Sequence, residues 1–335
     1  MIAQMFVQAI VQVSRPRPAA RHLYVLGCCM NDRAKGDSPR PLDALDVLPT
    51  MSVRATGFDL INFLLGLAWL GEVSTAHIRR LWLPQTSLRP VQRLVRSLRQ
   101  EELIEPRYWY GRAPRPRAPP IRRGRLWALT KSGRRLIHEH DQYPLRRSPA
   151  RHRRLMDHDV MTTEIIVRIV ELGRAAGLSG LYVEREARVD PLLPRPVMDA
   201  LIITRTGGNF AHSHLVPWTK DAKVAGEQRR RYALENDRDS EPIATIIGKA
   251  IAYQQAGTPV WVERYGDFPV PMWVVPGEAR LQTIMRAWQS AWPQGKWIIT
   301  TDAWIQSDRW IEYYGGYVRE RTLFPRTSAQ EESAP

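Results

Sequence analysis

Cysteine and long apolar runs are what this sequence most lacks. Its only two cysteines, Cys28 and Cys29, are adjacent and cannot form a disulfide framework, so a reducing, cytoplasmic compartment is expected. No run of about 18 apolar residues occurs, which predicts that no helix spans a membrane. The mildly apolar start, residues 1–13, has no basic segment before it and is therefore a poor signal peptide.

Motifs of several enzyme classes are missing as well. There is no glycine-rich phosphate loop, so ATP hydrolysis is not expected. No serine–histidine–aspartate or cysteine–histidine set stands out. His212 and His214 place two imidazoles on one side of an extended segment, but no third ligand has zinc-site spacing. The sequence therefore does not predict a zinc site.

Acidic residues are scarce in one part of this basic chain. The formal net charge is +15, and residues 51–157 carry 22 Lys+Arg against 8 Asp+Glu. Residues 106–135 contain no acid at all. Arginine concentrated without compensating acids is the electrostatic footprint of a polyanion binder. Nucleic acid is the first candidate partner. An anionic membrane is the weaker one, because no long lysine-rich amphipathic helix is evident.

The same region has the element order of a winged helix-turn-helix domain, predicted over residues 56–142. Helices are expected over 58–70, 74–82 and 87–100, followed by a hairpin with a basic loop and a helix capped by Thr130. The third helix would enter the major groove of double-stranded DNA, and the wing would follow phosphates or the minor groove. The predicted DNA-binding residues are Arg89, Arg93, Arg96, Arg99, Arg112, Arg115, Arg117, Arg122, Arg123, Arg125 and Lys131.

Two predicted strands in the second half of the chain each present a carboxylate. They cover 195–204, with Asp199, and 232–236, with Glu235, and Lys249 lies on the helix expected next. Carboxylates on neighbouring strands can share Mg²⁺ or Mn²⁺, and a nearby lysine can hold a phosphate or orient a water. This is the arrangement of metal-dependent nucleases of the PD-(D/E)xK type, with Asp199 and Glu235 as metal ligands and Lys249 as the third catalytic candidate.

The spacing of these residues is unusual for that motif. The lysine normally lies two residues after the second acid, and Asp237 stands there, as a further candidate for the site. Lys249 would have to supply its amine from the following helix. Glu164 could add a third carboxylate, although a glutamate at such a position is more often a helix-surface residue. The alternative is a strand pair whose end charges are solvated.

The remaining predicted elements complete a mixed α/β (α+β) fold. They are helices over 160–172 and 278–290, and strands at 181–183, 259–262, 271–275 and 296–300. Their order matches the α-β-β-β-α-β core of PD-(D/E)xK nucleases. The expected parts of the chain are a flexible or mis-assigned extension over 1–55, the winged helix over 56–142, a basic hinge over 143–157, the nuclease-like domain over 158–326 and a disordered tail over 327–335.

Several short motifs follow one another along roughly residues 56–315. They are Leu129-Thr-Lys-Ser-Gly133, His158-Asp159, Arg195-Pro-Val-Met-Asp199-Ala-Leu201, Leu234-Glu-Asn-Asp-Arg-Asp-Ser-Glu241, and Lys249 with Tyr253. In this order they resemble the replication-relaxation family of plasmids and other bacterial mobile elements. The resemblance implies DNA binding through the winged helix, a second domain of PD-(D/E)xK type, and a role in replication, relaxation or transfer beside other proteins of the same element.

The chain departs from the family pattern at two places. Two residues separate Pro196 from Asp199, where a family member more often has them adjacent. The loop from Pro217 to Arg231 is longer and more basic than a hairpin needs. Both departures concern the geometry around Asp199.

Three functions stay open on this basis. The favoured one is a DNA-binding accessory or regulatory protein of a mobile element, whose nuclease-like domain does not cut. The second is an Mg²⁺-dependent DNA nuclease or nickase. The third is a chromosomal transcription regulator whose second domain forms a homodimer or senses a ligand. The first two are separated by whether Asp199, Glu235 and Lys249 converge as a metal site does.

Overall fold

The computed structural model describes seven segments of the chain, all within the compact unit Thr50–Pro335. They are residues 60–110, 122–140, 156–187, 197–206, 228–239, 241–256 and 267–324. Several predictions lie outside these ranges and stay predictions. They concern Arg112, Arg115 and Arg117, His212 and His214, the strand at 259–262, and both chain ends.

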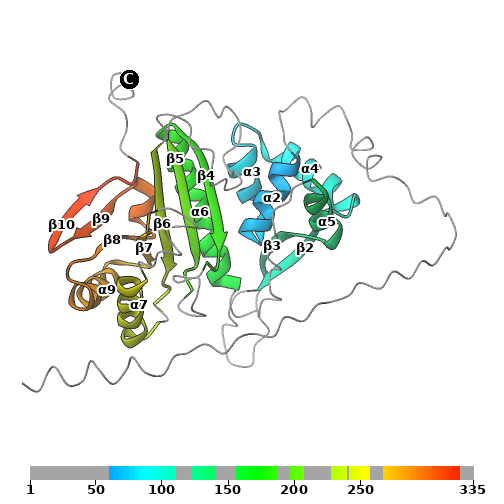
Figure 1. The fold of residues 1–335 in the computed structure, drawn as a ribbon. Helices are drawn as coiled ribbons and strands as arrows, with labels where there is room; N and C mark the ends of the chain where they lie inside the picture. The colour runs from blue at the N-terminus through cyan, green and yellow to red at the C-terminus, as the bar shows by residue number, and fades with distance from the viewer. Residues whose placement is uncertain are drawn as a thin grey trace, which may run out of the picture. The chain divides into compact units, whose positions relative to one another are not determined.

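A three-stranded antiparallel sheet and its helices form the first part of the described chain (Figure 1). The strand order is β1-β3-β2. The elements are α2 (Leu60–Leu70), β1 (Val73–Ser74), α3 (Thr75–Trp82), α4 (Leu88–Gln100), β2 (Ile104–Tyr110), β3 (Arg122–Leu129) and α5 (Lys131–His140). The three helices expected over 58–70, 74–82 and 87–100 are confirmed, as are the hairpin and the helix after Thr130.

Local side-chain chemistry begins and ends these helices. Ser74 caps α3, because its hydroxyl accepts from the His77 backbone N–H at 3.1 Å while the His77 imidazole accepts in return from the Ser74 N–H. Thr130 caps α5 by accepting from the Gly133 N–H at 3.0 Å. A side chain at Gly133 would collide with the Leu103 carbonyl. The glycine that ends the Leu129–Gly133 motif therefore lets α5 pack closely against the backbone at Leu103.

A seven-stranded sheet forms the second part, with the order β10-β9-β8-β7-β6-β5-β4. The pairs β6–β7 and β7–β8 are parallel and the others antiparallel. The strands are β4 (Leu178–Arg185), β5 (Ala200–Thr206), β6 (Gln228–Asn236), β7 (Val270–Val275), β8 (Lys296–Thr301), β9 (Trp310–Tyr314) and β10 (Tyr317–Arg321). The helices are α6 (Met156–Ala175), α7 (Ile243–Gln255), α9 (Glu278–Ala291) and the short 3₁₀ helix η3 (Trp304–Ser307).

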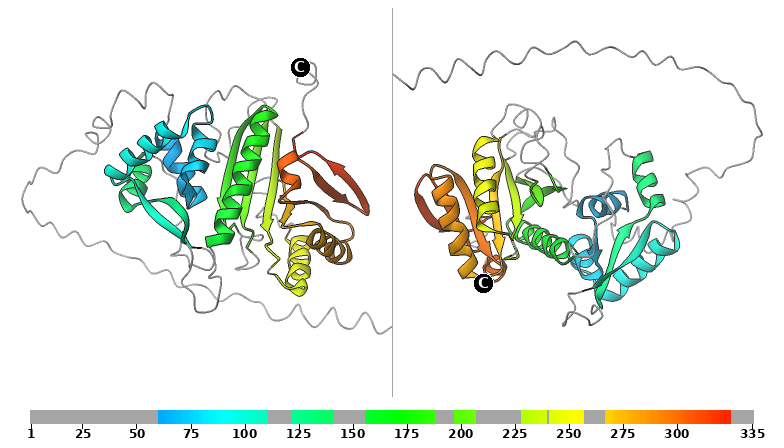
Figure 2. Two further views of the ribbon diagram at one scale, coloured as in Figure 1. Left: turned by 180° about the vertical axis from the view of Figure 1, so that it is seen from behind. Right: turned by 90° about the horizontal axis from the view of Figure 1, so that it is seen from below.

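Helices cover both faces of this sheet. Parallel neighbours need a crossover, and α7 and α9 lie in the two crossovers between β6, β7 and β8. Figure 2 shows α7 and α9 side by side, with α6 apart from them against β4. Side chains alternate along β6: Glu235 bonds to α7, while Asn236 donates to Thr162 on α6 at 3.0 Å. The described part of the chain is thus a mixed α/β structure.

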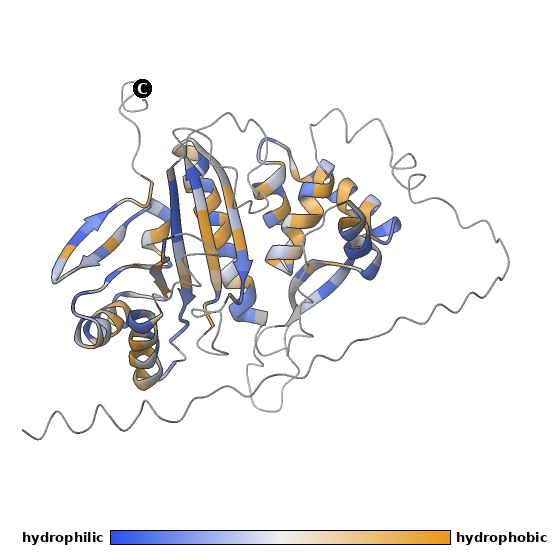
Figure 3. Cartoon of the chain, viewed as in Figure 1, coloured by the Kyte–Doolittle hydropathy of each residue, from blue (hydrophilic) through white to orange (hydrophobic). Residues whose placement is uncertain are grey.

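The core of the second sheet is rich in tryptophan. Trp273, Trp288, Trp297 and Trp310 are completely buried. The Trp288 ring lies 5.3 Å from Trp273 and 5.8 Å from Trp297, both in edge-to-face geometry. In the first part α2 is mostly orange, the colour of hydrophobic residues in Figure 3, and most of its residues are buried. No helix among the described residues is both long and apolar enough to cross a membrane.

Three sequence expectations need correction. Met156 and Asp157, the last two residues of the hinge expected over 143–157, belong to helix α6, and residues 143–155 lie outside the described ranges. The strand with Asp199 begins only at Ala200, so this acid precedes the strand. The strand at 296–300 is not the last one, because β9 and β10 follow it as a hairpin. The exposed sequence of β10, Tyr317–Arg321, has no apolar alternation to predict a strand.

Candidate nucleic-acid interface and a buried charge cluster

Helix α4 has one apolar and one cationic face. Val91, Val95 and Leu98 are buried, as their 3.6-residue spacing predicts. The arginines of the opposite face are exposed, and among the described residues none of them takes part in an ion pair. They are Arg89, Arg93, Arg96 and Arg99. The helix therefore presents four unpaired guanidinium groups to solvent.

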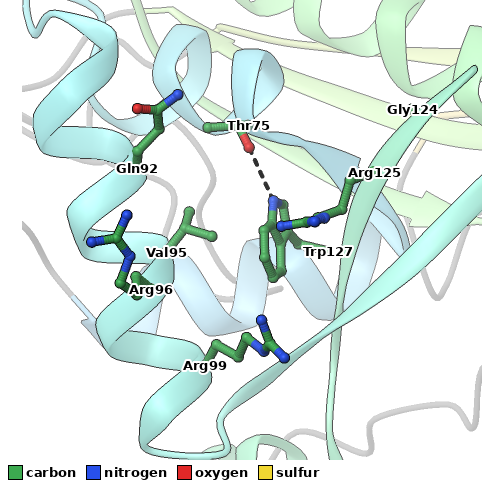
Figure 4. Close-up of a pocket in the computed structure, with 8 residues that line it drawn as sticks. All are labelled: Thr75, Gln92, Val95, Arg96, Arg99, Gly124, Arg125 and Trp127. Atoms are coloured by element: carbon green, nitrogen blue, oxygen red, sulfur yellow. Dashed lines mark hydrogen bonds between the residues drawn. The ribbon is translucent and has the colours of Figure 1, made fainter.

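A groove of about 630 Å³ lies between this helix and β3 (Figure 4). No acidic side chain lines it. Its lining is Thr75 from α3, Gln92, Val95, Arg96 and Arg99 from α4, and Gly124, Arg125 and Trp127 from β3. Three guanidinium groups from two separate elements thus converge on one groove, which favours an anionic ligand.

Aromatic contacts hold the β3 side of this groove in place. Trp127 is only 5 % exposed, and its indole N–H donates to the Thr75 hydroxyl at 3.0 Å. The Arg125 guanidinium carbon lies 5.7 Å from the centre of the Trp127 ring and 6.0 Å from that of Tyr108. Figure 4 shows the Arg125 side chain beside the ring of Trp127, at the edge of the groove.

The groove contains three of the predicted DNA-binding residues and some that were not predicted. Arg96, Arg99 and Arg125 line it, whereas the exposed Lys131 does not. Arg122 and Arg123 belong to β3, but their side chains lie outside the described part. Sequence reasoning missed Gln92, Thr75 and Trp127. The signal for Gln92 was its position four residues before Arg96, on the same helix face.

The register of β5 and β6 in the second sheet brings the carboxylates of Asp199 and Glu235 to the same end of these strands. Ala200 pairs with Leu234, and the Asp199 N–H donates to the Leu234 carbonyl at 3.0 Å. Asp199 and Glu235 therefore lie at the same end of neighbouring strands. The Asp199 carboxylate accepts from the backbone N–H of Asn236, the residue directly after Glu235, so both acids border the end of β6.

Glu235 is completely buried and bonded at both oxygens. Lys249 Nζ lies 2.7 Å from Oε2, and the Tyr253 hydroxyl donates to Oε1 at 2.8 Å. Burial raises the pKa of Glu235 to about 7, against the opposing charge of Lys249. Lys249 also lies 2.7 Å from Glu241 Oε1. Burial alone would lower the pKa of Lys249, but the charges of Glu235 and Glu241 raise it above its usual value.

Asp199 has a different set of partners. Its Oδ2 accepts from the Asn236 backbone N–H at 2.6 Å and lies 3.4 Å from His158 Nε2. Burial opposes ionisation, but the hydrogen bond and charge of His158 lower the pKa of Asp199. Burial likewise opposes the charge of His158, whose pKa Asp199 raises. The His158 Nε2 also lies 3.0 Å from the Asn236 carbonyl oxygen, so α6 is bonded to the end of β6.

Asp237, at the usual position of the lysine, has a structural partner. It is 1 % exposed and pairs with Arg280 of α9 at 2.5 Å. Arg280 also donates to the Glu241 carbonyl at 2.6 Å. Arg238 pairs with Asp302 at 2.7 Å. Ion pairs thus join the connection between β6 and α7 to α9 and to the end of β8.

Three of the four predicted catalytic residues lie together: Glu235 bonds to Lys249, and Asp199 lies at the same end of the neighbouring strand, whereas Asp237 bonds to α9. Within the described ranges, no three His, Cys, Asp or Glu side chains gather where they could hold a metal ion. Both oxygens of Glu235 already have protein partners, and the carboxylate has no solvent exposure. These residues do not fit a divalent ion without displacement of Lys249.

Glu164, considered above as a third carboxylate, bonds elsewhere. Its Oε1 and Oε2 lie 2.6 and 2.8 Å from Arg80 Nη1, and Oε2 is 3.0 Å from His77 Nε2. Arg80 also binds Glu171 in a bidentate manner, at 2.7 and 2.8 Å. Arg174 donates to backbone carbonyls at the end of α3. Helix α6 therefore bonds to α3 along one side and to the end of β6 through His158.

An exposed cationic helix beside a hairpin, with a seven-stranded sheet later in the chain, defines a two-sheet α/β protein with a basic groove. The family described as replication-relaxation matches residues 67–270, more than half of the chain. The chain belongs to this family, as its motifs indicated, and the family indicates a role in replication or relaxation of plasmids or mobile elements. No curated protein and no solved structure matches the chain.

Proposed function

We propose that this protein binds double-stranded DNA as a winged helix-turn-helix protein and acts in the replication, relaxation or transfer of a plasmid or mobile element. The element order supports the winged helix: α2, α3 and α4 precede the β2–β3 hairpin, and α5 follows it. The pair α3–α4 takes the place of the helix-turn-helix, with α4 as the helix that enters the major groove. The hairpin takes the place of the wing.

The observation that carries this proposal is the set of unpaired arginines on α4. Elsewhere arginines such as Arg80, Arg185 and Arg280 have acidic partners at 3.0 Å or less. Arg96 and Arg99 have none among the described residues, and they line the groove together with Arg125. Exposed cations without internal partners are what neutralisation of DNA phosphates requires.

For the second sheet we propose a PD-(D/E)xK-like fold in a non-catalytic role. The order α6, β4, β5, β6, α7, β7 supports the fold. The bonded state of Glu235 and Lys249 supports the role, because neither group is free to act on a metal or phosphate. The alternative is Mg²⁺- or Mn²⁺-dependent cleavage by Asp199, Glu235 and Lys249, which is favoured only by the convergence of these side chains.

DNA binding is tested by the salt dependence of affinity for labelled duplexes. Arg96→Ala/Arg99→Ala should weaken binding and make the slope of log K against log salt shallower, by about 0.9 for each phosphate that the variant no longer neutralises. Arg286→Ala is the matched control, since Arg286 is also an exposed arginine but lies on α9. An unchanged slope in the double variant would reject the α4 groove as the interface. Incubation of supercoiled DNA with Mg²⁺, Mn²⁺ or chelator tests for cleavage.

A further inference from the structure

We infer that Lys249 takes the place of a divalent cation in the second sheet, so that an internal ammonium group completes this site. The inference rests on the proposed PD-(D/E)xK-like, non-catalytic role of this part and explains how the acids there are neutralised. It starts from the misfit between the carboxylates and a metal ion.

The Lys249 ammonium group is surrounded by partners inside the protein. Two carboxylate oxygens, from Glu235 and Glu241, each lie 2.7 Å away. The ring of Trp273 lies on another side, with its centre 5.4 Å from Nζ. The lysine side chain is 13 % exposed. An ammonium held between two acids and an aromatic ring lacks the freedom to hold a phosphate or orient a water.

The acids around this ammonium repel one another without it. Glu235 and Glu241 both face Nζ, and the charge of Asp199 acts on Glu235 from the neighbouring strand. His158 lies 3.4 Å from Asp199, and Tyr253 donates a neutral hydroxyl to Glu235. Lys249 is therefore the group that offsets the charge of Glu235, the most deeply buried acid of the set.

Removal of the ammonium would leave a space bordered by carboxylate oxygens. The oxygens of Glu235 and Glu241 that now contact Nζ would face this space. Carboxylate oxygen is the ligand that Mg²⁺ and Mn²⁺ prefer. Loss of Lys249 should thus convert a metal-independent site into one that gains stability from a divalent ion, because an ion that binds only the folded state raises its melting temperature.

The test is thermal unfolding of the full chain in chelator, Mg²⁺ or Mn²⁺. Divalent ions should shift the Tm of the unaltered protein by less than about 1 °C. Lys249→Ala should lower the Tm in chelator by about 5–10 °C, and Mn²⁺ should restore part of that loss. Lys249→Ala/Glu241→Gln should lose the restoration. Lys296→Ala, at an exposed lysine of β8, is the control and should not respond to ions.

Two results would overturn the inference. One is a Tm of the unaltered protein that rises with Mn²⁺ and no longer does so in Glu235→Gln. The other is a folded Lys249→Ala protein that Mn²⁺ does not stabilise. If Lys249→Ala does not fold, electron paramagnetic resonance of Mn²⁺ with the unaltered protein decides. Specific Mn²⁺ binding that Glu235→Gln abolishes would contradict the inference. The absence of specific Mn²⁺ binding would support it.

Failure of this inference is distinguishable from failure of the proposed function. Lys249 does not line the α4 groove, so duplex affinity of the folded variants tests DNA binding separately. If the variants bind duplex DNA with unchanged affinity and the unaltered protein binds Mn²⁺ through Glu235, the inference alone would be overturned. Mg²⁺-dependent DNA cleavage that is lost in Lys249→Ala would overturn both the inference and the non-catalytic role.

Discussion

Charged side chains are arranged in opposite ways in the α4 groove and in the Glu235 cluster, the buried network of Glu235, Lys249 and their bonded neighbours. The groove gathers Arg96, Arg99 and Arg125 without an acid in its lining. In the cluster, Glu235 and Lys249 neutralise each other inside the protein. Burial explains the difference, because an unpaired buried ion costs several kcal/mol whereas an exposed guanidinium stays hydrated. The unpaired cations are thus available to an external polyanion, and the paired ones stabilise the fold.

The largest effect is expected where a paired charge is most deeply buried. Arg280→Ala removes the ion-pair partner of Asp237, a residue only 1 % exposed, and should destabilise the protein by about 3–5 kcal/mol. Urea unfolding measures the change. Arg286→Ala, on the same helix but exposed, should stay within about 0.5 kcal/mol. Equal stability of the two variants would break the distinction between the two regions.

A smaller loss is expected at the contact between α3 and α6. Arg80 binds Glu164 and Glu171 and is 23 % exposed, so solvent already screens part of this interaction. Arg80→Ala should cost about 2 kcal/mol in urea unfolding. Its neighbour Arg79 is exposed, and Arg79→Ala should have almost no effect on stability. A large effect of Arg79→Ala alone would show that the contacts of Arg80 do not decide stability here.

A third prediction concerns Arg93, an unpaired arginine of α4, and its contribution to DNA sequence discrimination. It is exposed on α4 but does not line the groove, and it would face base edges if α4 enters the major groove as proposed. An arginine that reads guanine is worth about 1–3 kcal/mol of discrimination. Arg93→Ala should therefore narrow the difference between target and random duplexes while stability stays unchanged. If affinity falls equally on both kinds of DNA, Arg93 contacts only phosphates.

The sequence predicted one of these regions better than the other, for a physical reason. Helix α4 follows from periodicity, because Val91, Val95 and Leu98 define a buried face and leave the arginines outside. The approach of Asp199, Glu235 and Lys249 was also predictable from strands and spacing. Their bonded state was not, since the roles of Tyr253 and Glu241 depend on how α7 packs against β6.

Boundaries and late strands show the same limit. Expected strands such as 271–275 carry continuous apolar runs, and β7 is found at Val270–Val275. β10 was missed because it is an exposed edge strand without apolar alternation, and it depends on its pairing with β9. The groove residue Trp127 was recognised only as part of a strand. Its contact with Thr75 joins residues that are 52 positions apart and left no local signal.

The smallest effect concerns His158 and Asp199, a pair at the border between buried and exposed charge. Asp199 raises the pKa of His158, so their attraction is fully present below the usual histidine pKa of about 6.5 and is lost as pH rises through the raised value. The pKa of Asp199 is lowered, so its part disappears only as pH falls through that lower value. The pair therefore stabilises the fold most strongly in mildly acidic solution.

His158→Gln tests this pH window. His158 Nε2 lies 3.4 Å from Asp199 Oδ2, and the two side chains are 30 % and 22 % exposed. The difference in unfolding free energy from the unaltered protein should therefore be under about 1 kcal/mol. It should be larger at pH 5.5 than at pH 8, where neutral His158 keeps only its bond to the Asn236 carbonyl. Glu235 titrates in both proteins, so its contribution cancels in the comparison. A difference that grows toward pH 8 would mean that His158 acts through packing and not through its charge.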